Sequence, residues 1–157
     1  MLKKPKQCSA WRIIAQMLEK PGAVIGLSTG QTTIGMHRIV SDIYSQYPFD
    51  VSRVTLFNVD ELTNLPREYA GSCYTMIYTQ LVGPLGIPDE NFIMPPTLSN
   101  DFEAEARLLD NAWQRAGAPT CRCWVSAAMV ISASTSQELL LRARPGYRRW
   151  IPTLKPG

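Results

Sequence analysis

The feature that most constrains this chain is an apolar run that changes abruptly into a segment of glycine and hydroxyl residues. The run covers residues 23–27, and it is followed by Ser28, Thr29, Gly30, Gln31, Thr32 and Thr33. An apolar pattern with helical spacing comes directly afterwards. This order predicts a buried parallel strand, a tight loop and a helix. Such a loop directs backbone N–H groups and a helix N-terminus at one point, which suits the binding of a phosphate group.

Two interpretations of this loop stay open from its residues alone. In the first, the hydroxyl groups of Ser28, Thr29, Thr32 and Thr33 add side-chain donors to a phosphate site. In the second, the segment is an ordinary strand-to-helix connection in which Thr32 or Thr33 caps the helix. The loop contains neither Gly-Lys-Ser/Thr nor G-x-G-x-x-G, so it does not match a Walker A or a dinucleotide-binding loop.

Length and composition fit a single α/β domain. With 157 residues, of which 45% are hydrophobic, the chain can bury one core, and nothing in it predicts disorder or a membrane span. The basic N-terminus leads into an amphipathic segment, so we expect no signal peptide and a cytoplasmic location. The four cysteines lack the spacing of a disulfide framework or a zinc site, so we expect reduced thiols, no metal and no cofactor.

The net charge of +3 hides an uneven distribution of charged residues. Residues 119–157 hold six basic residues and one acidic residue, whereas residues 1–118 hold ten basic and twelve acidic residues. A strongly basic tail is typical of a nucleic-acid-binding arm. We nevertheless expect no nucleic-acid or membrane partner.

Helical and strand patterns alternate along the first 118 residues. Apolar spacing predicts helices over 9–20, from 36 until Pro48, over 72–81 and over 101–116, and strands over 54–59 and 91–94. The first helix is expected to bury Trp11, Ile14, Ala15 and Leu18, residues 83–88 to form a turn-rich connection, and His37 to face solvent. This βαβα order predicts an α/β fold with a doubly wound, Rossmann-like parallel sheet.

Two carboxylates, Asp60 and Glu61, follow the predicted second strand. Ligands of open parallel sheets bind at the carboxyl ends of the strands, where residues 28–33 would also lie. A carboxylate at that edge can act as a general base if its surroundings tune its pKa. The alternative is that Asp60 and Glu61 only cap the loop that runs to Pro66.

Four segments together resemble the glucosamine-6-phosphate deaminase family. Residues 26–33 are similar to its phosphate loop, G-L-x-T-G-G/S-T-P, and residues 57–66 to its F-N-x-D-E-Y-x-x-L-P motif. Residues 72–76 and 87–92 are similar to its S-Y-x-x-F-M and I-P-x-E-N segments. The resemblance covers residues 10–118, a partial deaminase-like α/β domain within residues 1–118. Because Gln31, Thr33 and Leu62 depart from the pattern, the exact substrate is left open.

The resemblance implies an aldose–ketose isomerisation coupled to the loss of ammonia, with a phosphorylated amino sugar as substrate. Ser28, Thr29, Gly30, Gln31 and Thr32 would hold the 6-phosphate. Asp60 would take the C2 proton of the opened sugar, with Glu61 beside it in the catalytic motif. Full-length relatives can form homo-oligomers, and the sequence does not show whether this chain does.

The family's next motif, G-I-G-x-D/N-G-H-I-A/G-F-N-E-P, which supplies the ring-opening histidine and its acidic partners, is absent from residues 119–157. If the codons of residues 119–138 are read one base out of phase, they can encode D-L-Q-V-L-G-I-G-R-N-G-H-I-G-F-N-E-P-G. Three of these letters are forced, at the junctions 123/124, 124/125 and 129/130, and all three match the family. We therefore infer a frameshift near 117–119 and a tail, 119–157, without native fold, rather than a genuine basic C-terminus.

The missing motif bears on activity, since removing members of a catalytic unit typically lowers the rate by orders of magnitude. We therefore expect the chain as written to be inactive.

Two rival functions remain. The 6-phosphogluconolactonases share the fold and a similar loop, but carry arginine after Asp-Glu where this chain has Leu62. The sugar-phosphate effector domains of bacterial transcription regulators need a helix-turn-helix upstream, whereas about one helix precedes the first strand here.

Overall fold

A four-stranded parallel sheet forms the centre of the fold in the computed structural model, which describes residues 5–58, 60–117, 121–122 and 147–149. The strands stand in the order β4-β2-β1-β5, and every neighbouring pair is parallel. Their bounds are Val24–Gly26 for β1, Thr55–Phe57 for β2, Phe92–Ile93 for β4 and Cys121–Arg122 for β5. Numbered along the chain, this is the 3-2-1-4 order of a doubly wound sheet, which confirms the predicted fold class.

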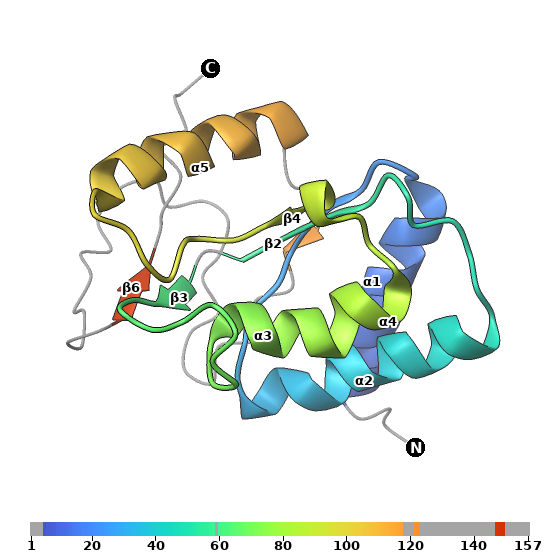
Figure 1. Cartoon of the computed structure of the whole chain (residues 1–157). Helices are drawn as coiled ribbons and strands as arrows, with labels where there is room; N and C mark the ends of the chain where they lie inside the picture. The colour runs from blue at the N-terminus through green and yellow to red at the C-terminus, as the bar shows by residue number, and fades with distance from the viewer. Residues whose placement is uncertain (1–4, 59, 118–120, 123–146, 150–157) are drawn as a thin grey trace.

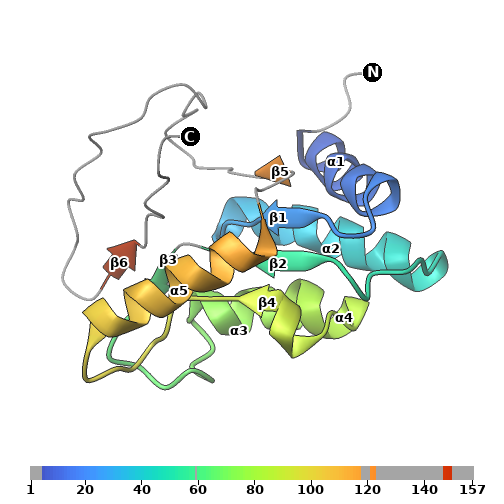
Figure 2. The same cartoon turned by 90° about the horizontal axis from the view of Figure 1, so that it is seen from above.

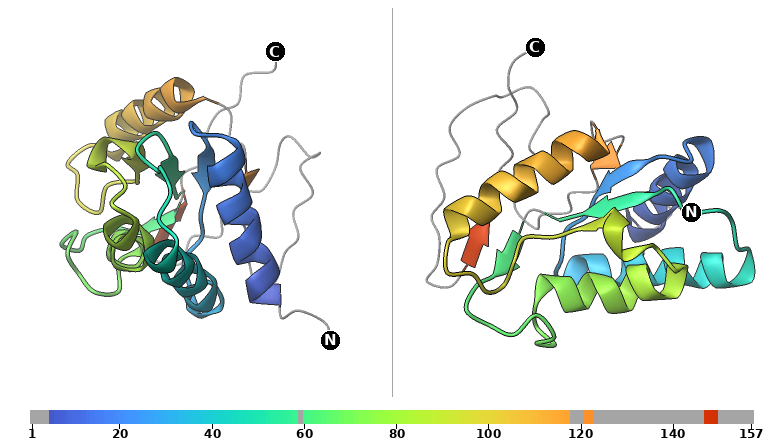
Figure 3. Two further views of the ribbon diagram at one scale, coloured as in Figure 1. Left: turned by 90° about the vertical axis from the view of Figure 1, so that its right-hand side faces the viewer. Right: turned by 45° about the horizontal axis from the view of Figure 1, so that its top comes forward.

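Helices cover both faces of this sheet (Figure 1, Figure 3). One face carries α1, α2 and a helical segment made of α3, η1 and α4, and the other carries α5 (Figure 2). Their bounds are Pro5–Glu19 for α1, Gln31–Gln46 for α2, Cys73–Ile77 for α3, Tyr78–Val82 for the π-helical turn η1, Gly83–Leu85 for α4 and Phe102–Ala116 for α5. A 3₁₀ turn, η2, covers Asp89–Asn91. The predicted helix over 101–116 is therefore confirmed.

Strand β1 is buried on both faces, as expected of a central parallel strand. The side chain of Ile25 packs into the core formed with α1, α2 and the α3–α4 segment, where Met36 and Leu81 are also fully buried. The side chain of Val24 points to the opposite face and packs with Leu109 of α5. The apolar run at 23–27 thus fixes the centre of the molecule, and the residues that follow it lie at the carboxyl edge of the sheet.

A second, two-stranded sheet stands beyond the carboxyl end of β2. It pairs β3 (Asp60–Leu62) with β6 (Tyr147–Arg149) in antiparallel register, with Asp60 opposite Arg149. Strands β5 and β6 are the parts of 119–157 that the structure describes. The prediction that this tail has no native fold otherwise concerns residues outside the described ones.

The predicted buried face of α1 is wrong by about one residue. The helix buries Ala10, Ile13, Ile14 and Met17, whereas Trp11 and Leu18 are 52% and 58% exposed. Both sets follow an i, i+3, i+4, i+7 pattern and share Ile14, so periodicity alone does not choose between them. Tertiary packing decides between the two sets, because the first set lies in the core that also holds Met36 and Val40 of α2.

The helix predicted over 72–81 continues to Leu85, so residues 83–85 do not belong to the turn-rich connection. The N-cap is Ser72, whose side chain accepts a hydrogen bond from the backbone N–H of Thr75. Pro84 is tolerated because the helical hydrogen bonding restarts in α4 around it. The helix ends at Gly86, whose φ of 68° is left-handed and suits glycine.

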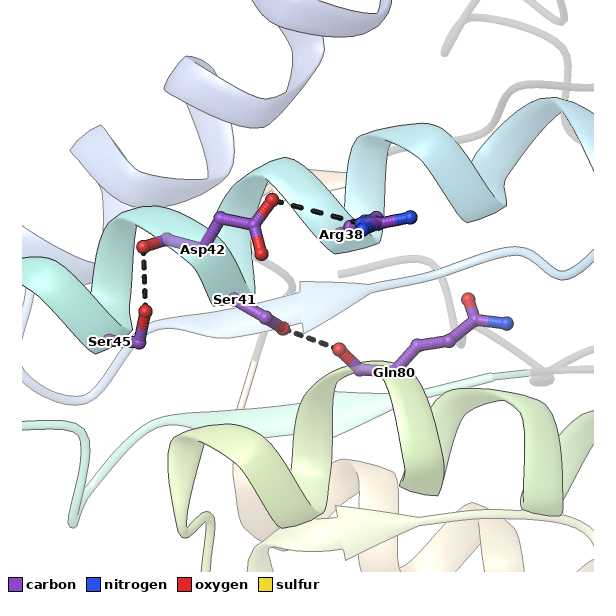
Figure 4. Close-up of polar contacts among 5 residues, drawn as sticks. All are labelled: Arg38, Ser41, Asp42, Ser45 and Gln80. Atoms are coloured by element: carbon purple, nitrogen blue, oxygen red, sulfur yellow. Dashed lines mark hydrogen bonds and ion pairs between the residues drawn. The ribbon is translucent and has the colours of Figure 1, made fainter.

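The prediction that His37 faces solvent is also wrong. Its side chain is fully buried between α2 and η1, and its Nδ1 lies 2.7 Å from Oε1 of Gln80. One turn further along α2, the Ser41 hydroxyl donates to the backbone carbonyl of Gln80 (Figure 4). The outer side of α2 carries the pair Arg38 and Asp42, which is well exposed and stabilises the helix little. Polar residues that look solvent-facing in the sequence therefore fasten α2 to η1.

Candidate functional site

Residues 28–32 connect β1 to α2 at the carboxyl edge of the central sheet. Ser28, Thr29 and Gly30 are half-buried, and Gln31 and Thr32, in the first turn of α2, are exposed. The first turn of an α-helix supplies no intrahelical acceptors for its own N–H groups, so such a turn can receive an anion. The structure therefore brings all five predicted loop residues together at one exposed edge.

Gly30 is the N-cap of α2, so neither Thr32 nor Thr33 has that role. Gly30 has a φ of 136°, a backbone conformation that residues other than glycine rarely adopt. Space is not the reason for glycine here, because a Cβ atom would meet no neighbour within 4 Å. The hydroxyl and the backbone N–H of Thr33 both donate to the Gly30 carbonyl, at 2.9 and 3.1 Å. These two bonds hold the bend at which the loop enters the helix.

Asp60 lies at the same edge, beyond the neighbouring strand. The backbone N–H of Leu27 donates to the Phe57 carbonyl at 2.8 Å, which joins the ends of β1 and β2 just before the loop and the carboxylates begin. Asn58 is buried, and its side-chain amide donates to the backbone carbonyl of Asp60 at 3.1 Å. Asp60 itself is half-buried. The strand-end juxtaposition expected from the sequence is thus present.

Glu61, in contrast, is fully buried and its carboxylate is used within the protein. Oε1 accepts hydrogen bonds from the backbone N–H groups of Leu62 and Cys73, and Oε2 accepts one from Tyr74, each at 2.8 Å. A carboxylate at the start of a helix is stabilised by the free N–H groups of the first turn. Glu61 therefore anchors the start of α3 against β3, next to Asp60.

Cys73 is a site residue that sequence reasoning missed. Its Sγ lies 3.0 Å from Oγ1 of Thr29 in the loop, and its side chain is buried. Burial is the main cause that raises the pKa of this thiol to about 12; the negative charges of Glu61 and Asp60 raise it further and the contact with Thr29 opposes the shift. The thiol therefore keeps its hydrogen at neutral pH. The available sequence signal was that Cys73 lies in residues 72–76, one of the four segments that resemble family motifs.

His37 and its partner form a second buried polar group, separate from the loop contacts described above. Burial lowers the pKa of His37, and the hydrogen bond to Gln80 opposes this shift. In the described part of the chain, its Nε2 atom has no hydrogen-bond partner. A neutral ring that donates from Nδ1 to Gln80 satisfies this arrangement best. Within the same described residues, no three His, Cys, Asp or Glu side chains are placed to hold a metal ion.

Comparisons with curated proteins identify the relatives of this chain. No protein-family model matches it. Over 114 residues it is 33% identical to the glucosamine-6-phosphate deaminase of Clostridium botulinum (strain Loch Maree / Type A3), a match that covers 73% of this chain and 47% of that protein. It is 30% identical over 105 residues to the glucosamine-6-phosphate deaminase of Alkaliphilus oremlandii, which covers 67% and 44%. The chain resembles the glucosamine-6-phosphate deaminases. It spans about half the length of these relatives.

Solved structures agree on the fold of this deaminase-like chain. A monomeric glucosamine-6-phosphate deaminase of the NagB superfamily matches with a TM-score of 0.67 at 24% identity, over 71% of this chain and 46% of that one. The 6-phosphogluconolactonase from Plasmodium vivax matches with a TM-score of 0.61 at 26% identity, over 74% and 43%. The enzyme of that name from Thermotoga maritima gives 0.60 at 19%, over 74% and 52%. The fold is therefore that of a group of sugar-phosphate enzymes.

None of the helices in the described part of the chain combines the length and the apolar character needed to cross a lipid bilayer.

Proposed function

We propose that residues 28–32 bind the phosphate of a hexosamine 6-phosphate and that Asp60 is the base of a glucosamine-6-phosphate deaminase. The observation that carries the proposal is the hydrogen bond from Leu27 to Phe57, which puts the loop and the carboxylate at one edge of the sheet. The similarity to deaminases of known name supports the same reaction.

The proposed chemistry begins with the sugar in its open form. The Asp60 carboxylate takes the hydrogen on C2 as a proton. The electron pair left behind forms a double bond between C1 and C2, while the C1=O double bond opens and its oxygen takes up a proton, which gives an enolamine. Return of a proton to C1 breaks the C1=C2 double bond and makes an imine at C2. Water adds to this imine, and the carbon–nitrogen bond then breaks, which releases ammonia and leaves fructose 6-phosphate. The loop contributes the hydroxyls of Ser28, Thr29 and Thr32 and the first turn of α2, which hold the phosphate and so fix C2 beside Asp60.

We further propose that the 157-residue chain binds sugar phosphate weakly and does not turn it over. Residues 119–157 lack the histidine motif of the deaminases, which an out-of-phase reading restores. Without the group that opens the sugar ring, the proton on C2 is not accessible to Asp60. The 157-residue chain would therefore keep part of the binding site and lose the reaction.

Hydrolysis of 6-phosphogluconolactone is the second candidate. The similarity to the Plasmodium vivax enzyme, at a TM-score of 0.61 and 26% identity, favours it. Against it stands Leu62, which occupies the position of an arginine in the lactonase motif. The two functions differ in chemistry, since a lactonase adds water to an ester and releases no ammonia.

Calorimetry tests the phosphate site directly. The chain is titrated with glucosamine 6-phosphate, with glucosamine and with 6-phosphogluconate. Tighter binding of glucosamine 6-phosphate than of glucosamine supports the phosphate loop, and preference over 6-phosphogluconate supports the deaminase assignment. Equal binding of the phosphorylated and free sugars contradicts the proposal, and preference for 6-phosphogluconate favours the lactonase.

A further inference from the structure

The thiol of Cys73, at the start of α3, contacts the proposed phosphate loop. Its Sγ lies 3.0 Å from Oγ1 of Thr29, although the two residues are 44 positions apart in the sequence. Cys73 is 4% exposed, so water competes little for this contact. Thr29 is half-buried, so part of this residue remains exposed to solvent.

The position of this thiol is fixed by the Glu61 carboxylate. The backbone N–H of Cys73 donates to Oε1 of Glu61 at 2.8 Å, and Glu61 is fully buried. The same carboxylate holds Tyr74, the next residue of α3. The hydrogen bond to Glu61 holds the backbone of Cys73 in place at the start of α3. From this position the side chain of Cys73 reaches Thr29.

The direction of the hydrogen bond decides what Thr29 can offer to a ligand. A threonine hydroxyl has one hydrogen and two lone pairs. A fully ionised phosphate carries no hydrogen, so it accepts hydrogen bonds and donates none. If Thr29 donates to Sγ, it turns lone pairs toward the ligand and repels the phosphate. If Sγ donates to Oγ1, the hydroxyl hydrogen is left to bind a phosphate oxygen. The thiol is able to donate, because it remains protonated at neutral pH.

We propose that Cys73 is a positioning residue of the phosphate loop, whose S–H donates to Thr29 and so turns the Thr29 hydroxyl hydrogen toward the phosphate of the bound sugar. This inference rests on the proposed function, in which the loop holds that phosphate. Glu61 completes the arrangement, because it fastens the cysteine that orients the loop and adjoins Asp60 in the chain. No bond forms or breaks at the sulfur.

A double-mutant cycle on the 157-residue chain tests this role. Affinity for glucosamine 6-phosphate is measured by calorimetry for the wild type, Cys73→Ala, Thr29→Val and the double variant. Thr29→Val should weaken binding by on the order of tenfold, as expected for the loss of a hydrogen bond to a charged group. Cys73→Ala should also weaken binding, by no more than Thr29→Val does, because the Thr29 hydroxyl is then no longer oriented toward the phosphate. In the Thr29→Val background, Cys73→Ala should have no further effect, because the hydroxyl that it orients is gone. Cys73→Ser, which keeps a donor, should bind as the wild type does.

Glucosamine without phosphate is the control ligand, and its binding should be the same for all variants. If the wild type binds the two sugars equally, the phosphate loop itself is wrong. If the wild type prefers the phosphorylated sugar and Cys73→Ala does too, with unchanged affinity, the positioning role is overturned while the proposed function stands. Additive losses in the double variant overturn it as well.

Circular dichroism establishes whether each variant folds. Should Cys73→Ala not fold, the infrared S–H stretching band of Cys73 gives the answer, measured in a variant in which the other three cysteines, Cys8, Cys121 and Cys123, are replaced by serine. This band should lie at the lower frequency of a hydrogen-bonded thiol, both before and after glucosamine 6-phosphate binds, because the thiol donates to Thr29 in both states. A band at the frequency of a thiol that donates no hydrogen bond contradicts the proposal.

Discussion

Glu61 accepts a hydrogen bond from the backbone N–H of Cys73 at 2.8 Å, across twelve residues of sequence. This bond joins the strand that begins with Asp60 to the helix that faces the phosphate loop. The carboxylate is fully buried and also holds Leu62 and Tyr74, so it connects the proposed base with the proposed phosphate site. Its effect on both is structural, since its oxygens are directed at the protein backbone.

Replacement of Glu61 should therefore lower the stability of the fold. Glu61→Ala leaves three backbone N–H groups without their acceptor and should reduce the free energy of unfolding by about 3–5 kcal/mol. Glu61→Gln keeps one oxygen but turns an amide donor toward one of those N–H groups, so it should lose about 1–3 kcal/mol. Urea unfolding measures both. The exposed Glu68 is the control, since Glu68→Gln should change stability by less than about 0.5 kcal/mol; equal effects at the two sites would contradict the anchoring role.

A side chain at Gly30 should destabilise the protein because of the backbone conformation of this residue. Gly30→Ala should lower the free energy of unfolding by about 1–2 kcal/mol, since φ is 136° there, and weaken the binding of glucosamine 6-phosphate. Gly22→Ala is a matched control, because a Cβ atom meets no neighbour within 4 Å at either glycine and Gly22 has no positive φ. Unfolding in urea and calorimetry of the two variants separate strain from crowding. An effect of the same size at Gly22 would exclude the backbone explanation.

His37 should make the stability of the protein depend on pH. Burial lowers its pKa below the ordinary value of 6.5, so the unfolded chain binds the proton more readily than the folded one. Stability from this group is fully present above pH 6.5 and is lost as the pH falls below 6.5 toward the folded pKa, by at most about 1.4 kcal/mol per pH unit. Urea midpoints measured between pH 7.5 and 5.5 check this. His37 is the sole histidine of the chain, so His37→Gln should remove the histidine part of the slope, and a slope that persists unchanged would point to other groups.

The central part of the fold was predictable from the sequence because its signals are local. The apolar run at 23–27, the change to hydroxyl residues after it and the helical spacing that follows predict β1, the loop and α2 without knowledge of any partner. The same holds for Asp60, since the end of a strand in a parallel sheet fixes its edge. These are the residues that the structure brings together as expected.

The predictions that were wrong or missed concern contacts between segments far apart in the chain. The burial of His37 depends on Gln80, and the role of Cys73 depends on Thr29, each more than forty residues away. The buried face of α1 depends on which of its two apolar stripes packs into the core shared with α2. Periodicity reports which residues share a face and not what that face meets.

The catalytic proposal is tested most directly by restoring the reading frame. One base is inserted near codon 118, and the longer protein, its Asp60→Asn variant and the 157-residue chain are incubated with glucosamine 6-phosphate. The account predicts ammonia from the restored protein, none from the 157-residue chain, and from Asp60→Asn neither ammonia nor exchange of the C2 hydrogen with solvent, because an amide does not accept that proton. Ammonia release by the 157-residue chain, or a restored protein that folds and releases none, would contradict it.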